Sequence, residues 1–198
     1  MKIALILAHP SPASYGAALA KVCARALGEA GVDVIVRDLY AMDFDPRLTA
    51  AELAGAGQRP EADVVAERSL LSAVDGLLLV YPLWFNGPPA ILKGYVDRVL
   101  SAGFGYQPTA HGADPLLVGK TLMSVTTSGA PDVWIEKSGA LNTLNRHFDL
   151  HLSAMTGLRV VGHEHLGGIG PGMSADFADR GFDQARASVM TAFLGLDD

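Results

Sequence analysis

Residues 2–16 read Lys-Ile-Ala-Leu-Ile-Leu-Ala-His-Pro-Ser-Pro-Ala-Ser-Tyr-Gly and open the pattern that the rest of the chain repeats. The apolar run lacks alternation of polar and apolar residues, which is typical of a strand covered on both faces. It is short and stops at His9-Pro10 without a small-residue cleavage pattern, so it predicts a strand rather than a signal peptide. Apolar residues at helical spacing then predict a helix over 15–29, with Gly31 as its stop signal.

The same alternation of apolar runs and amphipathic segments continues along the chain. Strands are predicted over residues 2–8, 32–37, 76–81, 119–125 and 158–163. Further helices are predicted over residues 61–74, 88–101, 138–155 and 175–194, the second of them with Pro88-Pro89 in its first turn. Strands that alternate with helices indicate βαβ units, and therefore an α/β three-layer sandwich around a parallel sheet. The two long connections are residues 38–60 and 102–118, and connections of this length are usually functional.

Composition and charge limit the class of protein. The chain has 198 residues, 49% hydrophobic and 18% charged, which suits one globular domain spanning residues 1–198. The net charge of −6, with no basic cluster, argues against a nucleic-acid partner. No apolar stretch reaches the roughly 18 residues of a membrane-spanning helix. The single cysteine, Cys23, excludes an intrachain disulfide and favours a cytoplasmic protein with a buried, unreactive thiol.

The loop after the first strand suits a phosphate group. In an open parallel sheet, ligands bind beyond the carboxyl ends of the strands. Residues 9–16 contain His9, Ser14 and Tyr15 and lead into a helix, whose free N–H groups and dipole favour an anion. The loop matches neither the dinucleotide-binding nor the P-loop glycine pattern. The alternative is purely structural, with Ser14 as a helix N-cap and His9 as an ordinary loop residue.

Two more loops follow predicted strands. Residues 81–89 place Trp84 and Phe85 on a strand-to-helix connection, where large rings suit a flat ligand, a contact beneath a loop, or a subunit contact. Residues 126–131 read Thr-Thr-Ser-Gly-Ala-Pro, and their small side chains would let a ligand approach backbone N–H donors. A phosphate-suited loop, an aromatic loop and a small-residue loop at one sheet edge together describe a phosphate-bearing planar heterocycle. A flavin fits that description.

Several segments resemble one family in order and spacing. They are residues 8–10, 39–46, 82–99, 103–106 and 126–129, among which the Pro89-Ala90-Ile91-Leu92-Lys93-Gly94 run is the most specific. Over roughly residues 1–165 the chain resembles the DT-diaphorase-like NAD(P)H:quinone oxidoreductases of the flavodoxin-2 fold. The resemblance implies a five-stranded parallel sheet of order 2-1-3-4-5. It also implies non-covalently bound FAD, or FMN in some members, NAD(P)H as reductant, and a homodimer with active sites at the interface.

The resemblance also assigns residues to roles. By position, the group around the flavin phosphates is His9, Ser14, Tyr15 and Gly16. The wall along the isoalloxazine is Pro82, Leu83, Trp84, Phe85 and Asn86, and the loop bonding the polar ring edge is Thr126, Thr127, Ser128 and Gly129. On the substrate side stand Tyr106, which would reach the partner's flavin, and Trp134. The implied reaction is ping-pong, with hydride passing from NAD(P)H to the flavin and two electrons then passing to a quinone-like acceptor.

The chain departs from the family pattern where the acceptor binds. Trp134 and Ala140 occupy the positions of a Tyr and a His that assist charge transfer to the quinone in mammalian-type members, so no catalytic proton donor is assigned. His111, in a long connection, is the substitute donor, although an exposed loop histidine more often faces solvent. The family resemblance still implies a quinone-like acceptor, and an azo dye, a nitroaromatic or free flavin is the alternative. A flavodoxin-like ancillary subunit of a potassium efflux system is the second class.

Other motifs receive a structural interpretation. His163 and His165 are expected on one face of a strand, and His147 and His151 on one face of a helix. Neither pair has a nearby Cys or carboxylate group of the expected type, so no metal site is predicted. The glycine-rich residues 167–172 follow the last strand, and we expect them to line the mouth of the site rather than to bind a second nucleotide.

Overall fold

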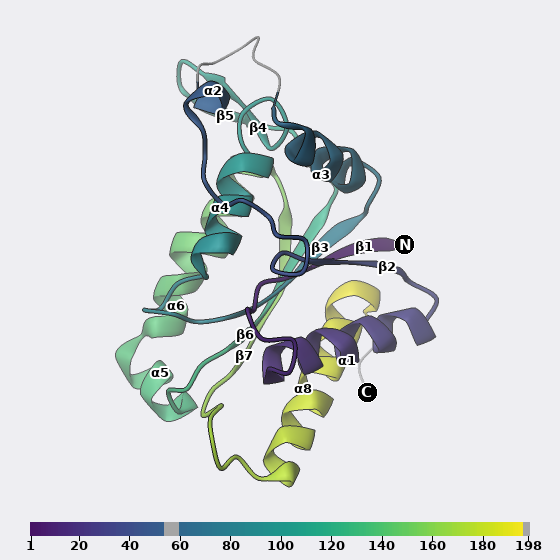
Figure 1. Cartoon of the computed structure of the whole chain (residues 1–198), viewed down its shortest axis with the longest axis vertical. Coiled ribbons are helices and arrows are strands. Elements are labelled where there is room, and N and C mark those ends of the chain that lie inside the picture. The colour runs from purple at the N-terminus through teal and green to yellow at the C-terminus, as the bar shows by residue number, and fades with distance from the viewer. Residues whose placement is uncertain (54–59, 196–198) are drawn as a thin grey trace.

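The computed structural model describes residues 1–53 and 60–195 and contains one five-stranded sheet (Figure 1). All neighbouring strands in it are parallel. The order is β2-β1-β3-β6-β7, which is the predicted 2-1-3-4-5 once the strands of a small hairpin are left out. The flavodoxin-like α/β fold class is therefore confirmed. The five strands are β1 (Lys2–Leu7), β2 (Asp33–Asp38), β3 (Gly76–Pro82), β6 (Thr121–Thr127) and β7 (Arg159–Leu166).

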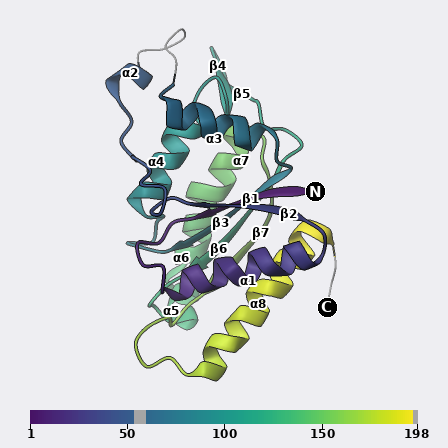
Figure 2. The same cartoon turned by 45° about the vertical axis from the view of Figure 1, so that its right-hand side comes forward.

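Helices cover both faces of this sheet, so the interior has two apolar layers. Figure 2 shows one layer of helices on each side. The central strand β3 is buried at every residue, which explains its unbroken apolar sequence. None of the helices within residues 1–53 and 60–195 has the length and apolar character that a membrane crossing requires. One face carries α1 (Tyr15–Glu29) and α8 (Ala175–Leu194), and the other carries α3 (Ala62–Ser72), α4 (Ala90–Val99) and α7 (Leu150–Thr156).

The helix predicted over residues 138–155 is wrong as a single element. A helix α5 (Asp132–Ser138) precedes it and ends at Gly139, whose φ of 67° lies in the left-handed region. The remainder divides into α6 (Ala140–Leu144), one wide π-helical turn η1 (Asn145–Asp149) and α7. The apolar spacing correctly predicted a buried face, but a period of 3.6 residues does not indicate an extra residue within one turn.

Three smaller expectations also need correction. Pro88-Pro89 precede α4 rather than forming its first turn, because Pro89 is the N-cap residue. The connection 102–118 contains an antiparallel hairpin of β4 (Tyr106–Thr109) and β5 (Gly112–Pro115). The connection 38–60 contains the short helix α2 (Ala50–Leu53), and residues 54–59 lie outside the described part of the chain.

Arg98, on α4, binds residues of the connection 38–60 and of α3. Only 4% of Arg98 is exposed, and its guanidinium lies 2.7 Å from an Asp63 oxygen and 3.0 Å from a Glu52 oxygen. It also donates to the Asp45 carbonyl and stacks over the Phe44 ring. Burial alone would raise the pKa of both carboxyl groups, but hydrogen bonds from Arg98 lead to a net lowering.

Cys23 is fully buried on α1, as predicted. Burial raises the pKa of its thiol to about 12, so the thiolate needed for reaction is scarce at neutral pH.

Replacement of Gly94 by alanine should destabilise the protein. Helix propensity alone would favour alanine by about 1 kcal/mol. A Cβ on Gly94, however, would overlap the carbonyl oxygen and Cβ of Pro46, and overpacking of this kind costs about 1–3 kcal/mol. We therefore expect Gly94→Ala to lower the free energy of unfolding measured by urea denaturation.

Gly28→Ala is the matched control. Gly28 is an exposed residue of α1 with open space where its Cβ would lie. This substitution should raise the free energy of unfolding by roughly 0.5–1 kcal/mol. An equal gain in both variants would show that α4 and the Pro46 segment are not in close contact.

Candidate functional site

The loops after β1, β3 and β6 meet at one edge of the sheet. These strands are parallel neighbours, so their carboxyl ends leave the sheet together. Leu83 N–H donates to the Thr127 carbonyl at 2.7 Å, which joins the second loop to the third. The rings of His9 and Trp84 meet edge to face, with centroids 6.5 Å apart, which joins the first loop to the second. The predicted convergence of the three loops is confirmed.

The first loop presents the amino end of α1. Ser14 is the N-cap, and its hydroxyl accepts a bond from Ala17 N–H at 3.1 Å, so the capping interpretation is correct. The N–H groups of Tyr15 and Gly16 belong to the first turn, where helix geometry supplies no acceptor. The first turn has no acidic residue. The positive end of the helix dipole is therefore not offset by a side chain of that turn, and an anion would be stabilised there.

The His9 ring is held by its own loop. Its Nδ1 accepts a hydrogen bond from Ser11 N–H at 3.0 Å, so a neutral His9 carries its proton on Nε2.

The side chain of Tyr15 packs against α8. Its hydroxyl donates to the Ala178 carbonyl at 2.8 Å and its ring stacks on Phe182, both on α8. Burial, and then Asp179, raise the pKa of Tyr15 to about 12. Tyr15 can therefore offer a ligand its backbone but not its phenol.

The second loop turns sharply at two exposed aromatic residues. Trp84 and Gly87 exchange backbone hydrogen bonds of 3.0 and 3.1 Å around Phe85 and Asn86, whose φ values are 50° and 57°. Left-handed backbone at bulky residues is strained by roughly 1–3 kcal/mol and clusters at functional sites. Phe85 is fully exposed and Trp84 is 45% exposed, so these rings do not pack beneath a loop. The Asn86 amide donates to the Ala140 carbonyl at 3.0 Å and anchors the turn.

The third loop is held by backbone hydrogen bonds to β7 and to the segment that follows it. Thr126, Thr127 and Ser128 are buried, whereas Gly129 is exposed. The backbone N–H of Ser128 donates to the Leu166 carbonyl, and its own carbonyl accepts from Ile169 N–H at 2.9 Å. The glycine-rich residues 167–172 thus lie against the third loop, as expected for a segment that lines the same edge.

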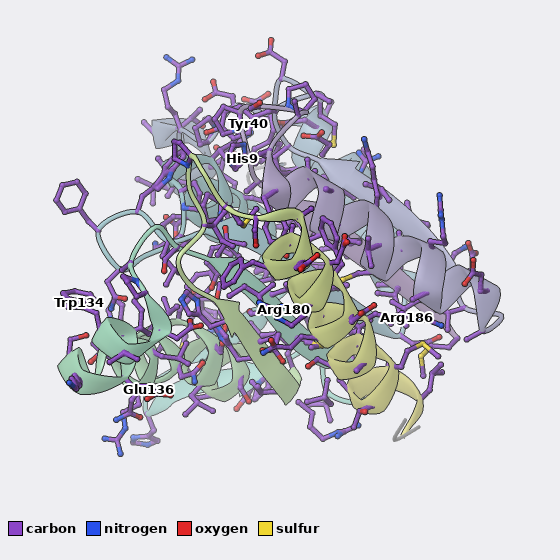
Figure 3. All side chains as sticks on the ribbon, turned by 90° about the horizontal axis from the view of Figure 1, so that it is seen from below. His9, Tyr40, Trp134, Glu136, Arg180 and Arg186 are labelled. Atoms are coloured by element: carbon purple, nitrogen blue, oxygen red, sulfur yellow. The ribbon has the colours of Figure 1, made fainter. Side chains whose placement is uncertain are left out.

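A cavity of about 680 Å³ brings Tyr106 to the aromatic turn. Phe85 and Tyr106 both line it, together with residues of α4, η1 and α7 that include His147 and His151. The two histidines therefore share one side of their helical segment, as predicted. Trp134 is not among the lining residues. It is 59% exposed on α5, and Figure 3 shows it at the rim of the molecule, well away from His9. His111 lies in the exposed turn of the hairpin.

A row of polar side chains between β6, β7 and η1 was missed by sequence reasoning. His163 Nδ1 lies 2.5 Å from an Asp149 oxygen, and His163 Nε2 lies 2.9 Å from the Thr126 hydroxyl. That hydroxyl is also 2.8 Å from His165 Nδ1, and His165 Nε2 is 3.1 Å from the Ser128 hydroxyl. Desolvation lowers the pKa of His165. The five side chains form one continuous hydrogen-bonded row.

The two strand histidines do share a face, as predicted, since both contact Thr126. The sequence did not indicate the carboxylate of Asp149, which η1 brings to His163. No group of three ligating side chains suited to a metal ion occurs among the described residues. Period-2 spacing of Ser124, Thr126 and Ser128, which continues beyond the predicted strand 119–125, could have indicated the row from sequence.

Comparison with known proteins agrees with this geometry. The chain matches a family model described as a flavodoxin-like fold over residues 1–191. It is 39% identical over 168 residues to an uncharacterized NAD(P)H oxidoreductase of Haemophilus influenzae, covering 83% of each chain. It is 34% identical over 152 residues to the ribosyldihydronicotinamide dehydrogenase (quinone) of Pongo abelii, covering 67% of this chain and 66% of that protein.

A solved structure extends the likeness to three dimensions. The NAD(P)H:quinone oxidoreductase from Methanothermobacter marburgensis superposes with a TM-score of 0.83 and 26% identity, over 96% of this chain and 95% of that chain. Sequence, family model and fold agree along nearly the whole chain. The chain therefore belongs to the flavodoxin-like family of NAD(P)H:quinone oxidoreductases.

Proposed function

We propose that this chain, as one domain of residues 1–198, binds FAD non-covalently and reduces a quinone-like acceptor with NAD(P)H. FMN is the alternative cofactor. The observation that carries the proposal is the meeting of three loops at the carboxyl edge of β1, β3 and β6, in a chain of this family. Each loop offers groups that suit the binding of one part of a flavin.

The loops fit the cofactor part by part. The amino end of α1 would hold the phosphates through Tyr15 and Gly16 N–H groups, with His9 beside them. Trp84 and the strained Phe85 would cover the ring system. The backbone of residues 126–129 would bond the polar ring edge, where close approach is open at Gly129. The cofactor supplies the hydride chemistry, and the protein binds it, orients it and excludes water.

The reaction follows a ping-pong order in this proposal. NAD(P)H would stack on the flavin and leave before the acceptor enters the same place. Backbone N–H donors of the third loop, fixed by the Ser128 and Ile169 bonds, would stabilise negative charge at the ring edge without reorganising. Trp134 is proposed on the acceptor side through the family correspondence alone, and Tyr106 through the cavity that it shares with Phe85.

A homodimer is part of the proposal. Phe85, which lines the cavity, and Leu150, on α7, expose 109% and 51% of their surface, and Val118 exposes 73%. Exposed large apolar residues favour a subunit contact. We place the protein in the cytoplasm, in keeping with its single buried Cys23. An azo or nitro compound remains the alternative acceptor, and an ancillary subunit of an efflux system the alternative role.

Trp84→Ala should weaken flavin binding. We expect the purified protein to be yellow with one flavin per chain, and chromatography of the released flavin to identify FAD. Loss of a stacked ring costs about 0.5–1.5 kcal/mol, so the dissociation constant measured by flavin fluorescence should rise up to roughly tenfold.

Trp134→Ala is the matched exposed aromatic. It should leave the flavin dissociation constant unchanged and alter the KM for menadione, assayed with NADPH. A colourless protein that takes up neither FAD nor FMN would overturn the proposed function. Turnover of azo compounds without turnover of any quinone would replace the acceptor.

Leu150→Arg should disrupt the homodimer. Leu150 is exposed on α7, and a charge introduced at a desolvated apolar contact is unfavourable. Sedimentation analysis should show monomers for this variant at concentrations where the unmodified protein is dimeric. Val65→Arg, which changes a similarly exposed apolar residue on α3, should remain dimeric. Identical behaviour of the two variants would place the interface elsewhere.

A further inference from the structure

The row that joins Asp149, His163, Thr126, His165 and Ser128 runs from η1 to the third loop of the candidate site. At the η1 end, the side chains of Asp149 and His163 are 1% and 5% exposed. At the other end, Ser128 belongs to the third loop and is followed by the exposed Gly129. The row therefore joins a buried pair to the edge where the ligand is proposed to bind.

The Asp149–His163 pair at the η1 end is built to hold one proton. A carboxylate as buried as Asp149 is strongly unfavourable unless it is paired and hydrogen-bonded. Asp149 has both partners, because Ser124 donates to one oxygen at 2.9 Å and His163 Nδ1 lies 2.5 Å from the other. With a proton on each nitrogen, His163 neutralises the carboxylate and can donate through Nε2 to Thr126.

Two hydrogen-bonding patterns fit the same atoms. In the first, His163 is doubly protonated and donates to Thr126, which donates to His165 Nδ1. His165 Nε2–H then donates to Ser128, and the Ser128 hydroxyl donates to the Ala130 carbonyl at 3.0 Å. In the second, Ser128 donates to His165 Nε2, and His165 Nδ1–H donates to Thr126. Thr126 in turn donates to His163 Nε2, so His163 is neutral with its proton on Nδ1. Moving one proton along each link converts the first pattern into the second. That shift releases one proton at the Ser128 hydroxyl and leaves every other site with its hydrogen bond.

The proposed reaction consumes one proton that NAD(P)H does not supply. NAD(P)H gives two electrons and one proton as hydride, whereas reduction of a quinone to its hydroquinone takes two electrons and two protons. The second proton must come from water or from the protein. Neither Trp134 nor Ala140 can supply it, since an indole N–H and a methyl group are not acids at neutral pH.

We propose that this row is a proton relay, which stores one proton at the Asp149–His163 pair and delivers it at Ser128 to the reduced acceptor. The inference rests on the proposed function, and assigns the proton donor that it lacks. The pair is refilled by the reverse shift when water replaces the product beside Ser128. Asp149, His163 and His165 act through other groups and are positioning residues of the relay.

Other charged groups that face the row come from neighbouring elements. Asp132 of α5 acts on His165 electrostatically, and it also accepts from Gly167 N–H at 2.8 Å. The Tyr81 hydroxyl of β3 lies near Asp149, and burial followed by that carboxylate raises the pKa of Tyr81 well above its usual value. Glu164 lies between the two histidines in sequence but bonds Gln184 and Ser188 of α8, on the opposite face of the sheet. Glu164 is therefore outside the relay.

The two half-reactions of the flavin-loaded protein test the proposal. Rapid mixing with NADPH follows hydride uptake, and mixing of the reduced protein with menadione follows the step that consumes the proton. In His163→Gln we expect the second step to slow about 10²-fold while the first changes less than twofold. Ser128→Ala, which removes the delivering hydroxyl, should slow the same step. The matched control Glu164→Gln should leave both steps unchanged.

A second measurement is independent of turnover. Nitrogen chemical shifts of the histidine side chains, measured by NMR at neutral pH, report which ring nitrogens carry protons. In the unmodified protein we expect a proton on both nitrogens of His163, and in Asp149→Asn on only one, because the carboxylate that pairs with Nδ1 is gone. In Glu164→Gln the nitrogen shifts of His163 should not change.

The outcomes separate this inference from the proposed function. A protein that binds flavin and reduces menadione, but whose two half-reactions slow equally or not at all in His163→Gln, overturns the relay and leaves the function standing. Unchanged nitrogen shifts of His163 in Asp149→Asn also overturn the relay. Failure to bind any flavin overturns the proposed function, whatever the NMR result.

Discussion

Parallel strands can pair only if the chain crosses back along a helix after each one, and β1, β3 and β6 are three such strands side by side. All three then end at the same edge. Because helices cover both faces, the edge is where backbone and polar side chains can meet a ligand. The aromatic turn, the amino end of α1 and the third loop depend on this arrangement. So does the polar row, since two parallel neighbours with matched register place His165 opposite Thr126.

The sequence predicted the parts of the fold whose signals are local. Apolar runs located all five strands of the sheet, and helical spacing with a following glycine gave the bounds of α1. The convergence of the loops followed from topology, because a strand order fixes which strand ends are neighbours. Ser14 shows the limit of such reasoning, since it caps the helix and still leaves the amino end suited to an anion.

The rest depended on distances between residues far apart in the chain. The phenol of Tyr15 bonds to Ala178, more than 160 residues away, which no local pattern indicates. The contact between Asp149 and His163 needs a π-helical turn, and a period of 3.6 residues has no means of reporting one. The hairpin β4–β5 was hidden because its strands are short and mostly polar. Long connections were recognised as important without their structure being predictable.

The wide turn η1 has a consequence for how this family can be compared. A π-helical turn contains one residue more than an α-helical turn over the same rise. If one residue were lost from Asn145–Asp149, the turn could close as a regular α-helical turn, because it would then hold the usual number of residues over the same rise. The apolar faces of α6 and α7 could then still cover the sheet, while the wide turn that brings Asp149 to His163 would be gone. Chain length at this turn, and not only the identity of its residues, therefore bears on which side chain faces His163.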